Sequence, residues 1–171
     1  MTSPLLILTG ASGAGKTTLA RHFRDRYFAD CEVFIFDSIG VPAQETMETQ
    51  FGGPEAWQRA MTLQWMARIW SILSAARPVL FEGQMRIAFI QEALAAEGIT
   101  NARVVLVDCD DATRAARLDL DRAQPELANP IMMNWARFLR DDAKRLGADI
   151  LDTGNLTMEQ CVARLQAYLL G

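Results

Sequence analysis

Apolar and polar residues follow two different periodicities along this chain. Five short apolar runs, at residues 5–9, 33–36, 78–81, 103–107 and 149–151, are separated by stretches in which apolar residues recur every three or four positions. The short runs indicate buried strands, and the longer stretches indicate amphipathic helices. Because runs such as 103–107 are continuously apolar, they suit a parallel sheet with helices on both faces. The pattern therefore predicts an α/β fold of three layers around a five-stranded parallel sheet.

Six helices are expected between and after these strands. They are predicted at residues 16–27, 55–76, 86–97, from 112 onward, 131–146 and up to residue 170. The long helix 55–76 has an apolar stripe and is a candidate cap over a substrate. The segments near 38–54 and 121–130 contain Gly and Pro and are predicted to be excursions from the sheet.

Helix 131–146 has two chemically different sides. Its expected apolar side consists of Ile131, Trp135, Phe138, Leu139 and Leu146. Its other side carries three cations, including Arg140, close in sequence to Asp141 and Asp142. We expect these charges to form ordinary surface ion pairs.

The loop after the first strand carries the strongest chemical signal in the chain. It reads Gly10-Ala11-Ser12-Gly13-Ala14-Gly15-Lys16-Thr17-Thr18. Gly10, Gly15, Lys16 and Thr17 match the P-loop pattern G-x-x-x-x-G-K-[ST] in its required strand-loop-helix context. Such a loop turns backbone N–H groups towards a polyphosphate, its lysine reaches the outer phosphates, and its threonine hydroxyl binds Mg²⁺. A glycine-rich turn that binds nothing is the alternative, but it has no need of the Lys-Thr pair.

Acidic residues follow the predicted strands at the edge where this loop lies. The carboxyl ends of parallel strands meet at one edge of a sheet, which is where ligands of such folds bind. Asp37 follows the second strand and is our candidate for the base, or for the group that orients an acceptor hydroxyl. Glu82 follows the third strand and is the alternative for that role, or a group that holds metal-bound water. The sequence leaves open which of the two is the base.

Residues 117–130 form a candidate lid. Arg114, Arg117 and Arg122 approach or lie in this segment, and Pro125 and Pro130 interrupt its helical pattern. A mobile segment with arginines can close over a nucleotide and place positive charge on a transferring phosphoryl group. An exposed loop with surface arginines is the alternative, and the phosphate-binding loop upstream favours the lid.

Size and composition limit the other functions considered. With 171 residues, 50% of them hydrophobic, the chain is expected to form a single domain at residues 1–171, with a cap at about 38–76. A net charge of −4 makes nucleic acid an improbable partner. The three cysteines and the single histidine provide no His/Cys metal set. With no basic leader and no membrane-length apolar run, we expect a cytoplasmic protein that does not enter a membrane, either a monomer or a homodimer.

Taken together, these residues resemble the small P-loop kinases of the nucleoside monophosphate kinase-like class, which includes shikimate kinase, gluconate kinase and chloramphenicol phosphotransferase. The resemblance implies transfer of the γ-phosphoryl group from Mg²⁺-bound ATP to a hydroxyl or phosphate of a small molecule. It also implies that Asp37 touches the acceptor hydroxyl and that Arg117 and Arg122 cover the phosphates. The turn Thr153-Gly154-Asn155 would adjoin adenine. The segment Glu82-Gly83-Gln84 replaces the glycine triplet of shikimate kinases, so the acceptor stays open.

Two other functions are compatible with the same loop. A nucleotide-dependent switch would need a side chain that positions water, and Gln84 lies close to Glu82 for that purpose. A kinase that acts on polynucleotide ends would need a groove for a strand, which the acidic charge balance disfavours.

Overall fold

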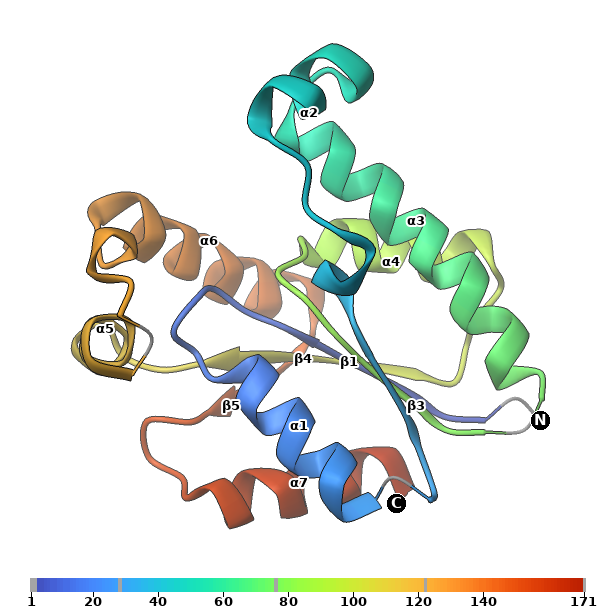
Figure 1. Ribbon diagram of the computed structural model, residues 1–171. Helices are drawn as coiled ribbons and strands as arrows, with labels where there is room; N and C mark the ends of the chain where they lie inside the picture. The colour runs from blue at the N-terminus through green and yellow to red at the C-terminus, as the bar shows by residue number, and fades with distance from the viewer. Residues whose placement is uncertain (1–2, 28, 76, 122, 171) are drawn as a thin grey trace.

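The protein is built around one parallel sheet, described here from a computed structural model that covers residues 3–170 except 28, 76 and 122 (Figure 1). Its strands are β1 (Leu5–Thr9), β2 (Glu32–Ile35), β3 (Val79–Glu82), β4 (Ala102–Asp108) and β5 (Asp149–Asp152). The strand order is β2-β3-β1-β4-β5, and every neighbouring pair is parallel. The predicted α/β fold with a five-stranded parallel sheet is therefore confirmed.

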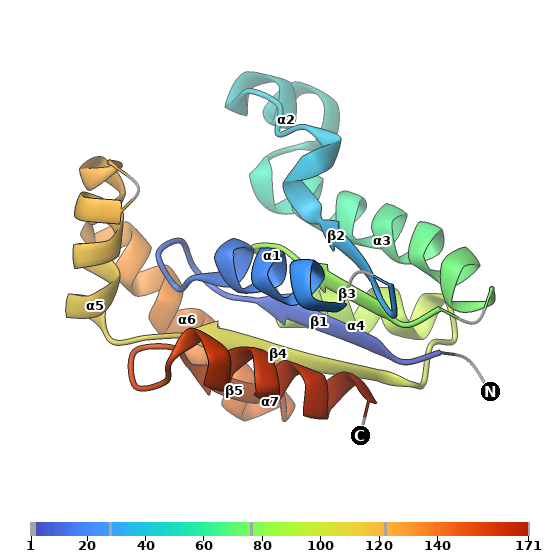
Figure 2. The ribbon, with the colours of Figure 1, turned by 60° about the horizontal axis from the view of Figure 1, so that its bottom comes forward.

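Helices cover both faces of this sheet, which gives the three predicted layers (Figure 2). They are α1 (Lys16–Tyr27), α2 (Gln44–Phe51), α3 (Pro54–Leu73), α4 (Ile87–Ala96), α5 (Asp111–Ala116), α6 (Pro130–Leu146) and α7 (Met158–Leu170). Helices α1 and α7 lie on one face, and α3, α4 and α6 lie on the other (Figure 1). None of the helices in the described part of the chain is both long and apolar enough to cross a membrane.

The central strand β1 shows why the chain must form layers. All five of its residues are buried. Successive side chains point to opposite faces, so Leu5 and Ile7 join the core beneath α3 and α4, while Leu6 and Leu8 join the core beneath α1 and α7. Because neither face of the strand tolerates water, helices are required on both sides.

Three short helical turns complete the chain at the edge of the sheet where the phosphate-binding loop lies. They are the 3-10 helix η1 (Phe36–Ile39), the π-helix η2 (Arg117–Asp121) and the 3-10 helix η3 (Pro125–Leu127). Strand β2 was expected at 33–36 but ends at Ile35, because η1 begins at Phe36. Consequently Asp37 lies in a helical turn directly after the strand.

Two predicted elements differ in their extent. Helix α3 ends at Leu73 rather than at residue 76, which lies outside the described residues. The segment expected to be an irregular excursion at 38–54 contains helix α2, which Gly52 ends in a left-handed conformation, with φ of 85°. Helix α2 stands away from the sheet, above the N-terminal half of α3 (Figure 1).

The apolar side predicted for α6 is only partly buried. Leu139 is buried, but Ile131 is 79% exposed and Phe138 is 40% exposed, so the prediction is wrong for these two residues. Ile131 lies in the first turn of α6, where no element of the described chain covers it. Phe138 stacks on Trp135, with ring centroids 5.4 Å apart, at the border of the core. Periodicity identified the correct side of the helix but not how far its neighbours extend.

Candidate active site

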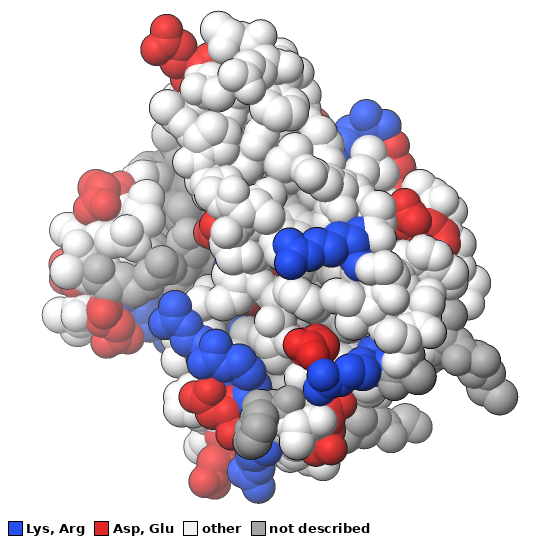
Figure 3. Space-filling view, turned by 45° about the vertical axis from the view of Figure 1, so that its right-hand side comes forward, with Lys and Arg blue, Asp and Glu red and all other residues white. Residues whose placement is uncertain are grey.

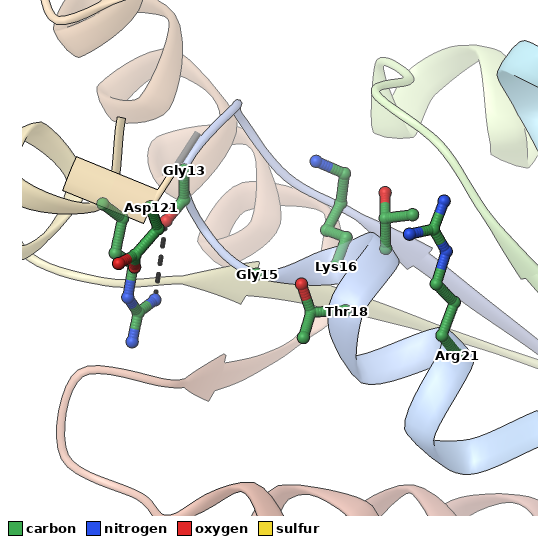
Figure 4. A pocket seen from close by; sticks show the side chains of 8 residues that line it. Gly13, Gly15, Lys16, Thr18, Arg21 and Asp121 are labelled. Carbon is green, nitrogen blue, oxygen red and sulfur yellow. Dashed lines mark hydrogen bonds between the residues drawn. The ribbon is translucent and has the colours of Figure 1, made fainter. Parts of the chain in front are cut away.

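The loop between β1 and α1 encloses a cavity of about 310 Å³ (Figure 4). The cavity is lined by Gly13, Gly15, Lys16, Thr17, Thr18, Arg21, Arg117 and Asp121. Gly10 has φ of 151°, and a Cβ at this position would lie 2.2 Å from the carbonyl oxygen of Val107. No larger residue fits there, so glycine is required for the loop to pass so close to β4.

Lys16 and Thr17 project from the first turn of α1 at the edge of this cavity. Lys16 is largely buried, and its Nζ donates a hydrogen bond of 3.2 Å to the carbonyl oxygen of Ala11. The Thr17 hydroxyl donates a hydrogen bond of 2.8 Å to Oε1 of Glu82, at the end of β3. The structure thus brings together the lysine, the threonine and one of the two predicted acids.

Glu82 is buried, and only 2% of its surface is exposed. Burial raises the pKa of its carboxyl group, and the negative charge of Asp37 raises it further, whereas Lys16, the Thr17 hydroxyl and Arg21 lower it. Asp37 itself is exposed. Both candidate acids lie at the carboxyl edge of the sheet, because Glu82 ends β3 and Asp37 follows the neighbouring strand β2.

Arg21 is a site residue that the sequence interpretation missed. It is exposed, it lines the phosphate cavity, and its charge acts on Glu82. Figure 4 shows its side chain beside the start of α1, on the opposite side of the cavity from Asp121. The available signal was its position four residues after Thr17, which places both on one side of a helix.

Arg114 holds the outer side of the loop and is completely buried. Its Nη1 donates to the carbonyl oxygen of Ser12 at 2.9 Å, and its Nη2 donates to Oδ1 of Asp108 at 2.7 Å. Arg140 donates from Nε to the other carboxylate oxygen of Asp108 at 2.6 Å. The expected pairing of Arg140 with Asp141 or Asp142 is therefore wrong, because a strand-end carboxylate lies within its reach.

Arg117 holds the end of the same loop. Its Nη1 donates to the carbonyl oxygen of Ala14 at 3.3 Å and to the Thr153 hydroxyl at 2.8 Å, and its Nη2 donates to the carbonyl oxygen of Thr153 at 2.9 Å. Arg117 lines the phosphate cavity, but its guanidinium is already bonded to the protein, and its predicted contact with phosphates stays a prediction. The second predicted lid arginine, Arg122, lies outside the described residues.

These contacts orient two amide groups of the loop. In a trans peptide the C=O and N–H point in opposite directions. The carbonyl groups of Ser12 and Ala14 bind Arg114 and Arg117 on the outside, so the N–H groups of Gly13 and Gly15 point the other way. Gly13 and Gly15 are the loop glycines that line the cavity. The arrangement presents amide donors to an anion.

A second cavity of about 240 Å³ adjoins the first beside the turn that precedes α7. It is lined by Gly15, Thr18, Leu19, Arg117, Asp121, Thr153, Leu156, Met158 and Cys161. Thr153 lines this cavity, and its hydroxyl also donates to the carbonyl oxygen of Ala14 at 2.8 Å; that the turn adjoins adenine stays a prediction. The backbone N–H of Gly154 and the side chain of Asn155 instead donate to the carboxylate of Asp152. The apolar lining residues 156 and 158 were missed, because only the turn carried a signal.

Gln84 lies against the loop from the other side. Its Oε1 accepts a hydrogen bond of 3.2 Å from the Ser12 hydroxyl, and its carbonyl oxygen accepts one of 2.9 Å from Gln58 of α3. These two hydrogen bonds tie the segment after β3 to the phosphate loop and to α3. A switch protein would need a side chain at this position that is free to position water. The side chain of Gln84 is instead bonded to the Ser12 hydroxyl.

The charges on the outer surface are mixed. On the face shown in Figure 3, Lys and Arg side chains are interspersed with Asp and Glu and form no single basic surface. Much of this face carries no charge.

The comparisons with known proteins relate this geometry to solved structures. No protein-family model matches the chain, and no curated protein matches it. A shikimate kinase from Acinetobacter baumannii in complex with shikimate is 23% identical, with 99% of this chain and 94% of that chain covered and a TM-score of 0.64. A gluconokinase from Sinorhizobium meliloti 1021 is 13% identical, with 99% and 93% covered and a TM-score of 0.63.

A third solved structure, the tunicamycin resistance protein of Deinococcus radiodurans, is 19% identical, with 96% of this chain and 94% of that chain covered and a TM-score of 0.63. At these identities the similarity establishes the fold over nearly the whole length of the chain. This protein therefore has the fold of the small P-loop kinases that it resembles in sequence.

Proposed function

We propose that this protein transfers the γ-phosphoryl group of ATP to a hydroxyl or phosphate group of a small molecule. The observation that carries the proposal is the direct contact between Thr17 in the phosphate cavity and Glu82, an acid at the end of the neighbouring strand. A P-loop, a threonine hydroxyl and adjacent carboxylates are the parts that phosphoryl transfer requires.

The residues present fit a magnesium ion bound to a nucleotide. The Thr17 hydroxyl and the Glu82 carboxylate are hard oxygen donors 2.8 Å apart, and Mg²⁺ prefers such ligands, either directly or through water. When bound, the ion supplies charge neutralisation for the phosphate oxygens. A cation there would also favour the ionised form of Glu82, opposing the effect of burial on its pKa.

Residues of this chain perform the other tasks of the reaction. The amides of Gly13 and Gly15 and the ammonium group of Lys16 bind the phosphate oxygens and offset their negative charge. Asp37, which is exposed in η1 directly after β2, accepts the proton of the acceptor hydroxyl or orients that hydroxyl in line with the γ-phosphate. The adjoining 240 Å³ cavity, with Leu156 and Met158, provides apolar contacts for the base.

A screen of ATP consumption tests the proposal. The purified protein is assayed with magnesium and ATP against nucleosides, nucleotides, sugar acids and antibiotics of the aminoglycoside and phenicol types. We expect slow hydrolysis alone and a marked stimulation by one acceptor class. Lys16→Met should lower the stimulated rate by about 100-fold or more. Lys144→Met is the matched control, because Lys144 is exposed on α6, and it should leave the rate unchanged.

Asp37→Asn separates the roles of the two acids. We expect turnover to fall about 100-fold while the affinity for ATP changes by less than about threefold, because the residue faces the acceptor. Asp30→Asn, at another exposed acid before β2, serves as the control. Unchanged turnover of the Asp37 variant would assign the base to Glu82. Rapid hydrolysis with no acceptor would favour the switch function instead.

A further inference from the structure

The phosphate cavity and the second cavity meet at four residues. Gly15, Thr18, Arg117 and Asp121 line both of them. In a nucleoside triphosphate the ribose joins the base to the phosphates. A nucleotide that occupies both cavities therefore has its sugar beside these four residues.

Asp121 is the acidic member of this group. It is the last residue of the π-helix η2, and its side chain is exposed. Its carboxylate forms no hydrogen bond or ion pair with any other residue in the described part of the chain. Arg117, by contrast, has both Nη groups committed to the loop and to Thr153. Figure 4 shows Asp121 and Arg21 on opposite sides of the cavity.

A carboxylate is an unfavourable neighbour for phosphates, because like charges repel. Beside bound phosphates, a neutral hydrogen-bond donor that contacts the carboxylate offsets this repulsion. A ribose offers two adjacent hydroxyl groups, and an ionised carboxylate offers two oxygens that only accept hydrogen bonds. Acidic side chains recognise ribose hydroxyls in this way in dinucleotide-binding folds.

We propose that Asp121 is a specificity-determining residue that accepts hydrogen bonds from the ribose hydroxyls of the bound nucleotide. The site then selects ribonucleotides over deoxyribonucleotides. This inference rests on the proposed function, because it requires that a nucleotide occupies both cavities.

Binding measurements with three nucleotides test the inference. Calorimetric titrations compare ATP, 2′-deoxy-ATP and 3′-deoxy-ATP on the unmodified protein and on Asp121→Asn and Asp121→Ala. We expect the unmodified protein to bind ATP roughly tenfold more tightly than at least one deoxy analogue, since a hydrogen bond to a charged group is lost. Asp121→Ala should reduce that ratio to about one to two. The matched control is Asp119→Asn, at an exposed acid of the same turn that lines neither cavity, and it should retain the full ratio.

The other outcomes are distinguishable. Equal affinity of the unmodified protein for all three nucleotides would overturn the inference and leave the proposed function intact. If both Asp121 variants bind ATP and the deoxy analogues more tightly by the same factor, the carboxylate only repels phosphate, and the inference is wrong. Failure of the unmodified protein to bind any of the nucleotides would instead refute the proposed function.

Discussion

The buried carboxylate of Asp108 provides a sharp test of what holds the phosphate loop in place. It accepts hydrogen bonds from Arg114 at 2.7 Å and from Arg140 at 2.6 Å. Asp108→Asn keeps the shape of the side chain but removes its charge and one of its two acceptor oxygens. Arg114 is then left as a completely buried cation without an opposing charge.

The size of the effect follows from the burial of the two arginines. Removing one partner of a buried ion pair typically destabilises a protein by about 3–5 kcal/mol. The Arg140 side chain is 31% exposed, so water can compensate part of its loss. We therefore expect Asp108→Asn to lower the free energy of unfolding by about 3 kcal/mol. With a urea dependence of about 2 kcal/mol per molar, the midpoint falls by about 1.5 M.

Equilibrium unfolding in urea, followed by circular dichroism, measures this change. The control is Asp149→Asn, which breaks the ion pair with Arg103, whose side chains are 41% and 48% exposed. Exposed pairs contribute at most about 1 kcal/mol, so this midpoint should move little. If Asp108→Asn shifts the midpoint no further than the control does, the buried pair does not stabilise the fold as argued.

Three further predictions concern single residues near the site. Burial raises the pKa of Glu82, so the folded state binds a proton more tightly than the unfolded chain. The contribution of Glu82 to stability is therefore greatest below the ordinary carboxyl pKa and is lost as the pH rises through the raised pKa. Urea unfolding midpoints measured between about pH 4 and 8 should show this decline, and Glu82→Gln should abolish it. Gly83→Ala would place a Cβ 2.4 Å from Cβ of Phe36, so calorimetry should show a loss of about 1–3 kcal/mol. Ala123 has φ of 49°, and Ala123→Gly should raise the melting temperature by about 2 °C, because the relief of strain exceeds the added chain entropy.

The sequence was sufficient for the fold because each strand is marked locally. A strand whose side chains are apolar on both faces of the sheet must be covered by helices on both sides. Strand β1 is such a strand. The phosphate loop could likewise be recognised from neighbouring residues alone, because its glycines, Lys16 and Thr17 are close together in the sequence. The rule that parallel strands end at one edge placed Glu82 on the side of the sheet where this loop lies, and the structure adds its hydrogen bond with Thr17.

Contacts between distant residues could not be predicted in the same way. Arg114 and Ser12 are 102 positions apart, and their contact depends on how α5 turns after β4. Arg140 had acidic neighbours in its own helix, so nothing in the sequence favoured Asp108 instead. The position of Asp121 depends on the π-helical turn of η2, since an α-helical continuation would direct this side chain elsewhere.

The arginines also change where a lid can begin. Residues 117–130 were expected to form one mobile segment over the phosphates, but Arg117 binds both the loop and Thr153, which makes it part of the cradle. Any closing movement must therefore pivot after Arg117, or it would break the contacts that orient the amide of Gly15. Asp121, four residues further along and without a partner in the described chain, is the first acidic side chain beyond that fixed point that lines both cavities.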